Sequence, residues 1–152
     1  MGTWHNVLLV EVARDIDLDH MKRLGKAHED LLVDYPAGMV TFAIIGENVP
    51  IASNESRAES ARFVRALGQS LRRTVMVLEN KGVTAQLLQT VIRGINVIAR
   101  NPKLVIMPTV ESGIASVVTM VDGLPQSEVQ AGLTQAVAAL RAGYATKTAM
   151  SA

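Results

Sequence analysis

Hydroxyl and guanidinium groups gathered between residues 53 and 73 are the side chains in this sequence most suited to phosphate chemistry. Ser53 and Ser56 follow a loop and precede a stretch with helical spacing, so each is a candidate phosphoacceptor. A phosphate on either serine would meet the positive end of that helix and the neighbouring Arg57. Capping of the helix N-terminus explains the same two hydroxyls more simply. Both interpretations predict a helix that begins here.

Arginines follow the two serines along the same predicted helix, which we expect to continue to about Arg73. Five arginines against two glutamates give residues 54–73 a charge of +3. A solvated helix surface is the ordinary explanation of such a cluster, and an acidic protein partner or a phosphate ligand is the alternative. The residues predicted to bind a partner, of which the last three share one side of the helix, are Arg57, Arg62, Arg65 and Arg72.

The residue types that bind metal ions do not occur at the spacing that a metal site needs. Residues 15–19 begin like a calcium loop, but His20 and Lys26 occupy the sixth and twelfth positions, where glycine and glutamate are required. His20 and His28 lie about two helical turns apart, too far to share a metal without a third element. We predict no metal site, and we expect His28 to be a hydrogen-bonded, half-buried residue of an apolar helix face.

Catalytic motifs are missing as well. The sequence has no glycine-rich phosphate loop, and Ser112 lacks the flanking glycines of a nucleophile elbow. It also has no cysteine, which excludes thiolate chemistry. We therefore predict no catalytic and no cofactor-binding residues. An enzyme with an unfamiliar site is the remaining alternative, and it requires a cleft where Glu11, Asp34, His28 or Glu79 converge.

The composition describes one globular domain. The chain has 152 residues, of which 49% are hydrophobic and 19% charged, and this balance excludes disorder. A net charge of +1 does not favour nucleic acid as a partner. No apolar run approaches the roughly 20 residues of a membrane span, and the first residues lack the basic region of a signal peptide. We expect a cytoplasmic protein.

Short apolar runs alternate with stretches of helical spacing along the chain, as in α/β proteins. The predicted strands are residues 7–13, 39–45, 74–78 and 104–107. The predicted helices follow them at about residues 18–34, 54–73, 84–100, 112–121 and 127–142. Because helical crossovers join successive strands, we predict a four-stranded, mostly parallel sheet with alternating helices and an extra C-terminal helix.

The break at Asp122-Gly123-Leu124-Pro125 sets the last helix apart. We predict an α/β domain over residues 1–122, a C-terminal helix over residues 123–143, and a frayed tail over residues 144–152. One face of that helix is apolar and must be buried on its own sheet or on a second copy of the chain, which makes a homodimer one prediction. The face comprises Val129, Leu133, Val137 and Leu140.

Three segments of the middle and late chain carry a likeness to a known family. They are residues 74–78 with Gly82 and the helix 85–100, the Asn101-Pro102 break into residues 104–107, and the run from Thr109 to Ala115. In this pattern the chain resembles the STAS-like group, the fold of anti-sigma-factor antagonists, and especially a bacterial SpoIIAA-like branch. The likeness covers roughly residues 5–122. The phosphorylation segment of the antagonists, Asp-Ser-Ser-Gly-like, is replaced here by residues 52–56.

The resemblance implies a non-catalytic regulatory module that binds another protein and needs no cofactor. With the arginines and serines, it points to the predicted second helix and the loop from Gly46 to Ser56 as the docking region. A carrier of a lipid or another small molecule is the alternative that the architecture allows. It requires a continuous apolar cavity among residues such as Met21, Phe42, Phe63, Leu88 and Ile92.

Overall fold

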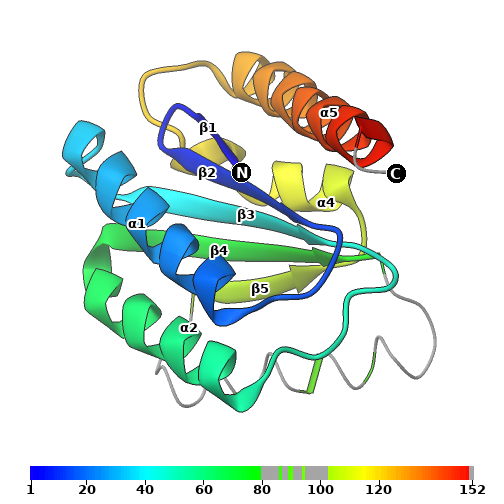
Figure 1. The fold of residues 1–152 in the computed structure, drawn as a ribbon. Helices are drawn as coiled ribbons and strands as arrows, with labels where there is room; N and C mark the ends of the chain where they lie inside the picture. Colours follow the sequence, from blue (N-terminus) through cyan, green and yellow to red (C-terminus); the bar gives the residue numbers. More distant parts are fainter. Residues whose placement is uncertain (80–85, 87–88, 91–93, 95–102, 151–152) are drawn as a thin grey trace.

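A five-stranded sheet forms the centre of the protein, in a computed structural model that describes residues 1–79, 86, 89, 90, 94 and 103–150. Its strands lie side by side in chain order (Figure 1): β1 Gly2–Trp4, β2 Val7–Val12, β3 Met39–Ile45, β4 Leu71–Leu78 and β5 Leu104–Met107. β1 is antiparallel to β2, and the other strands are parallel. The α/β class is confirmed, and the sheet is mixed and mostly parallel.

The prediction of four strands missed β1. This strand has three residues, which is too short for any periodicity to appear in the sequence. It folds back on β2 through a two-residue turn at His5 and Asn6, where Trp4 pairs with Val7 and His5 takes a φ of 47°. The Asn6 side chain fixes the turn by donating hydrogen bonds to the Gly38 carbonyl at 3.2 Å and the Met120 carbonyl at 3.0 Å.

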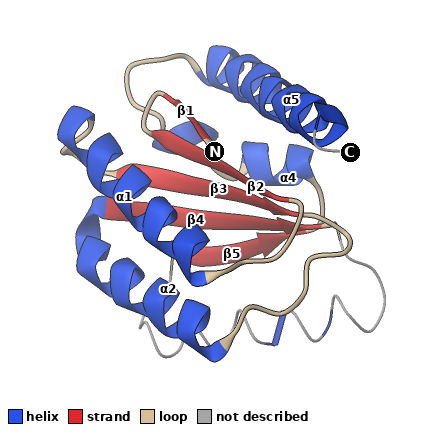
Figure 2. Ribbon diagram, in the orientation of Figure 1, coloured by secondary structure: helices blue, strands red, loops and turns tan. Residues whose placement is uncertain are grey.

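Helices α1, Leu18–Asp34, and α2, Asn54–Leu67, cover one face of the sheet (Figure 2). The Asp17 side chain caps α1 by accepting a hydrogen bond from the His20 amide. The predicted apolar stripe of α1 is confirmed, because Met21, Leu24, His28 and Leu31 are its buried residues. Gly25 of α1 faces Phe63 of α2, and a Cβ at this position would lie 3.7 Å from Phe63 Cβ, an ordinary van der Waals distance.

The second helix ends at Leu67, earlier than predicted. Gly68 takes a positive φ of 50° and stops it, and a short 3-10 turn, Gly68–Ser70, leads into β4. Leu71 continued the helical spacing in the sequence but begins the strand instead. Arg72 and Arg73 therefore lie in β4, and the prediction of one helical stripe through Arg62, Arg65 and Arg72 is wrong.

The other face of the sheet holds α4, Val110–Ala115, the 3-10 turn η2, Val118–Met120, and α5, Gln126–Met150. Thr109 caps α4, and the single helix expected over 112–121 is divided into α4 and η2. Gly113 allows α4 to reach the sheet, because a Cβ there would lie 2.9 Å from the Phe42 ring. Most of the helix predicted over 84–100 falls outside the described residues.

The C-terminal helix α5 packs on the sheet of its own chain (Figure 1). Val129, Leu133 and Val137 are buried there, so the face proposed for a homodimer is already largely covered. Gly132 lies against the Trp4 ring and allows the helix to approach β1 closely. The helix continues to Met150, past the predicted end. Gly143 does not end it, since a glycine inside a helix costs only about 1 kcal/mol. It includes residues 144–150, which were predicted as part of a frayed tail.

Candidate functional site

Ser53 and Ser56 occupy the beginning of α2, at the carboxyl end of the loop that leaves β3. The Ser53 hydroxyl accepts a hydrogen bond from the Ser56 amide at 3.1 Å, so Ser53 is the N-cap. It also donates to the Ser56 hydroxyl at 3.1 Å. The Ser56 residue is 1% exposed, whereas Ser53 is exposed. Of the two candidate phosphoacceptors, Ser53 is thus the one that an enzyme could reach in the folded protein.

The arginines of α2 differ in how their charges are used. Arg62 forms a bidentate pair with Glu59, with nitrogen to oxygen distances of 2.8 and 2.6 Å, and this pair lowers the pKa of Glu59. Arg57 donates to the Asn54 side chain and Arg65 to the Ala61 carbonyl. Within the described residues, Arg57 and Arg65 form no ion pair.

The charge of α2 is smaller than the sequence suggested. Two of the five arginines predicted in the helix lie in β4, so the helix itself has three arginines against two glutamates, a charge of +1. Because Glu59 pairs with Arg62, the surplus positive charge is concentrated at Arg57 and Arg65.

Arg72, predicted to bind a partner from the second helix, instead makes contacts within its own chain. It lies at the amino end of β4, whereas Ser53 follows the carboxyl end of the neighbouring parallel strand β3. Its guanidinium donates to the carbonyls of Ala37 and Met120, both at 3.1 Å, and pairs with Asp122 at 2.7 Å. The pair lowers the pKa of Asp122. Arg72 thus joins β4 to the loop before β3 and to the segment of η2 and Asp122, and the structure does not bring it to the other candidate residues.

The four residues predicted for an unfamiliar enzyme do not form one cleft. Glu11 and Glu79 do meet, because Arg141 of α5 pairs with Glu79 and places its Nε 3.6 Å from Glu11 Oε1. Burial raises the pKa of Glu11, and Arg141 opposes this shift. His28 lies between α1 and the sheet, and Asp34 is exposed at the end of α1.

An open cleft of about 450 Å³ borders this ion cluster, with Thr109, Glu111 and Thr134 on its wall beside Glu79 and Arg141. The guanidinium is used to hold the two glutamates, so the cluster joins α5 to the carboxyl ends of β2 and β4. Within the described residues, no group of three histidine, aspartate or glutamate side chains lies close enough to hold a metal ion.

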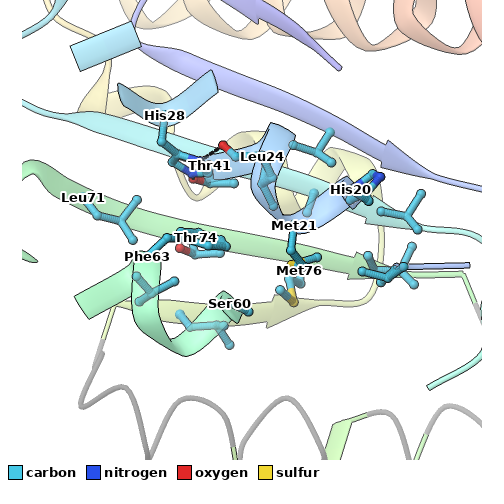
Figure 3. A pocket seen from close by; sticks show the side chains of 17 residues that line it. His20, Met21, Leu24, His28, Thr41, Ser60, Phe63, Leu71, Thr74 and Met76 are labelled. Carbon is cyan, nitrogen blue, oxygen red and sulfur yellow. Dashed lines mark hydrogen bonds between the residues drawn. The ribbon is translucent and has the colours of Figure 1, made fainter. Parts of the chain in front are cut away.

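An apolar cavity of about 90 Å³ lies between α1, α2 and the sheet (Figure 3). Met21 and Phe63 line it as the carrier hypothesis required, whereas Phe42 points to the opposite face of the sheet. Leu88 and Ile92 fall outside the described residues. Thr74 and Ser60 also line the cavity, and neither was predicted as a site residue.

Both ring nitrogens of His28 form hydrogen bonds, as predicted, but the residue is 1% exposed and therefore fully buried, not half-buried as predicted. Its Nδ1 lies 2.7 Å from the Leu24 carbonyl oxygen and its Nε2 lies 2.7 Å from the Thr41 hydroxyl (Figure 3). Burial lowers the pKa of His28, so the ring is neutral near pH 7.

Comparison with known proteins adds no assignment. The chain matches no protein family, no curated protein and no solved structure. In the part of the chain that the structure describes, no helix combines the length and apolar character needed to cross a bilayer. The likeness to the STAS-like group therefore stays a prediction from the sequence, beside a fold that is α/β with a mostly parallel sheet.

Proposed function

We propose that this protein is a regulatory protein-interaction module of the STAS-like type, which docks an acidic partner through α2 and the loop before it. The docking surface consists of Ile51, Ser53, Arg57, Arg62 and Arg65. One observation carries the proposal: consecutive segments of the chain place an exposed apolar side chain, an accessible hydroxyl and unpaired guanidinium groups on the surface.

Ile51 supplies an apolar contact on this surface. It is 36% exposed and is one of three large hydrophobic residues exposed in the described chain, the others being Met1 and Val33. An isolated exposed isoleucine needs no explanation by itself. Together with Arg57 and Arg65, which form no ion pair in the described part of the chain, it suits an interface in which an apolar anchor is surrounded by polar contacts.

The chemistry of the partner follows from the arginines. Arg57 and Arg65 make hydrogen bonds to neutral oxygens of α2, so their charge is available to a carboxylate on another protein. Arg62 shares its charge with Glu59 and adds less. A partner with acidic side chains opposite Arg57 and Arg65 would also associate faster at low salt.

Ser53 provides a means of control. A phosphate there would add about −1.5 to −2 charges at the N-terminus of α2, one turn from Arg57. The helix N-terminus and Arg57 would stabilise the phosphate. The same charge would repel an acidic partner, so phosphorylation of Ser53 should release it.

Affinity capture from an extract of the native cells tests the docking surface. The double variant Arg57→Glu and Arg65→Glu should recover at least about tenfold less of the specific partner than the wild type, because close opposite charges become like charges. The matched control, Arg23→Glu and Lys26→Glu, makes the same charge change on exposed positions of α1 and should recover the partner normally. Equal recovery by both double variants would refute the α2 surface.

A further inference from the structure

A cavity lies under α1 and α2, next to the buried apolar side chains on this face of the sheet. Protein interiors pack like organic crystals, and voids larger than a water molecule are few. This one measures about 90 Å³, and the 17 described residues that line it are mostly aliphatic or aromatic. Its walls come from both helices and from the sheet, for example Leu24, Phe63 and Met76 (Figure 3).

One of the residues that line this cavity, His20, has a buried polar atom without a partner. His20 Nε2 is buried and makes no hydrogen bond, although His20 belongs to the lining of the cavity. The other histidine of the wall is different, because His28 is bonded to both Thr41 and Leu24. Burial, followed by the charge of Arg23, lowers the pKa of His20 and favours its neutral ring. Burying a polar atom without a partner costs free energy, so a ligand that bonds it is favoured.

Water is a poor occupant of this space. A buried water usually makes about three hydrogen bonds, and cavities lined by apolar groups stay dry yet bind small apolar molecules. The size limits the ligand as well. A cavity of about 150 Å³ accommodates benzene, so one of about 90 Å³ suits roughly four non-hydrogen atoms, far fewer than a lipid chain.

We propose that this cavity is a binding site for a short neutral alcohol, with its alkyl part among Met21, Leu24 and Met76 and its hydroxyl bonded to His20 Nε2. A hydroxyl both donates and accepts, so it satisfies His20 whichever ring nitrogen carries the proton. An anion would leave water for an apolar enclosure at a large cost, which excludes short carboxylates. The proposal is independent of the docking surface, because the two use different side chains.

Titration of the full chain with 1-propanol, followed by NMR of the methionine methyl groups, tests the site. We expect saturable shifts with a dissociation constant in the millimolar range, given the small size of the probe. Nuclear Overhauser contacts should join 1-propanol to the methyl groups of Met21 and Met76. Absence of these contacts, or shifts that do not saturate, would overturn the proposal.

Two variants separate the polar contact from the space itself. Ala43→Leu fills the cavity from β3 and should abolish binding of 1-propanol and of xenon, whereas Ala131→Leu on the exposed side of α5 should change neither. His20→Phe keeps an aromatic side chain but removes both ring nitrogens. It should weaken 1-propanol roughly fivefold, the effect of one hydrogen bond, and leave xenon binding unchanged. Equal affinity of His20→Phe and wild type for 1-propanol would contradict the assigned contact.

Discussion

Replacing Phe42 with alanine is expected to lower the free energy of unfolding by about 3–5 kcal/mol, the range for a large aromatic side chain removed from a core. Phe42 is 1% exposed at the centre of β3 and belongs to the cluster between the sheet and α4 and α5. The close approach of Gly113 leaves α4 little freedom to fill the vacated space. Urea denaturation followed by circular dichroism measures the change.

Phe63→Ala is the matched control for this substitution. It removes the same atoms from the opposite side of the sheet, but Phe63 is only partly buried and borders the existing cavity. We expect it to lose less free energy than Phe42→Ala, because less apolar surface is returned to water. If Phe42→Ala costs less than about 1 kcal/mol, the packing described between β3 and α4 is incorrect.

Removing α5 is expected to have an even larger effect. A chain that ends at Asp122 loses Val129, Leu133 and Val137, which are 0%, 0% and 4% exposed. Their burial contributes about 5–9 kcal/mol at 1.5–3 kcal/mol per side chain, which is comparable with the whole stability of an ordinary domain. We expect the shortened chain to show no cooperative thermal transition and to aggregate in light-scattering measurements.

Leu133→Ala gives a graded version of the same test, with an expected loss of about 2–5 kcal/mol. Ala138→Gly, at an exposed position of the same helix, serves as its control and should cost about 1 kcal/mol. A shortened chain that stays monomeric and unfolds like the full chain would show that α5 is not part of the core.

The elements with the clearest patterns could be predicted from the sequence. The strands at 39–45 and 104–107 have the predicted bounds, because an apolar run ended by turn residues is a strong local signal. The buried face of α1 could also be predicted, from the helical spacing of its apolar residues. β1 could not be predicted, because its pairing depends on the turn at Asn6, whose side chain bonds to the distant carbonyls of Gly38 and Met120.

The faces of the sheet could not be assigned in the same way. Every residue of β3 is buried, so the usual alternation of apolar and polar residues is missing from its sequence. Phe42 was therefore assigned to the cavity with Phe63, although these two side chains lie on opposite faces. Arg72 was misplaced for a similar reason, since Leu71 fits both a helical and a strand pattern.

Only some features of the candidate site could be predicted from the local sequence. The cap at Ser53 was expected from residue types alone, whereas the burial of Ser56 depends on how α2 packs. Arg141 pairs with both Glu11 and Glu79 and so joins β2, β4 and α5. The spacing of these three residues in the sequence does not indicate that they meet.

The most direct test of the proposed docking surface is the affinity of the captured partner, once purified, for the chain with phosphoserine at position 53. The proposal predicts at least tenfold weaker binding than to the unmodified chain at low salt, and a smaller difference at high salt because screening reduces repulsion. Phosphothreonine at Thr134, an exposed residue of α5, is the control and should bind like the unmodified chain. Equal or tighter binding of the Ser53-phosphorylated chain would contradict the proposal.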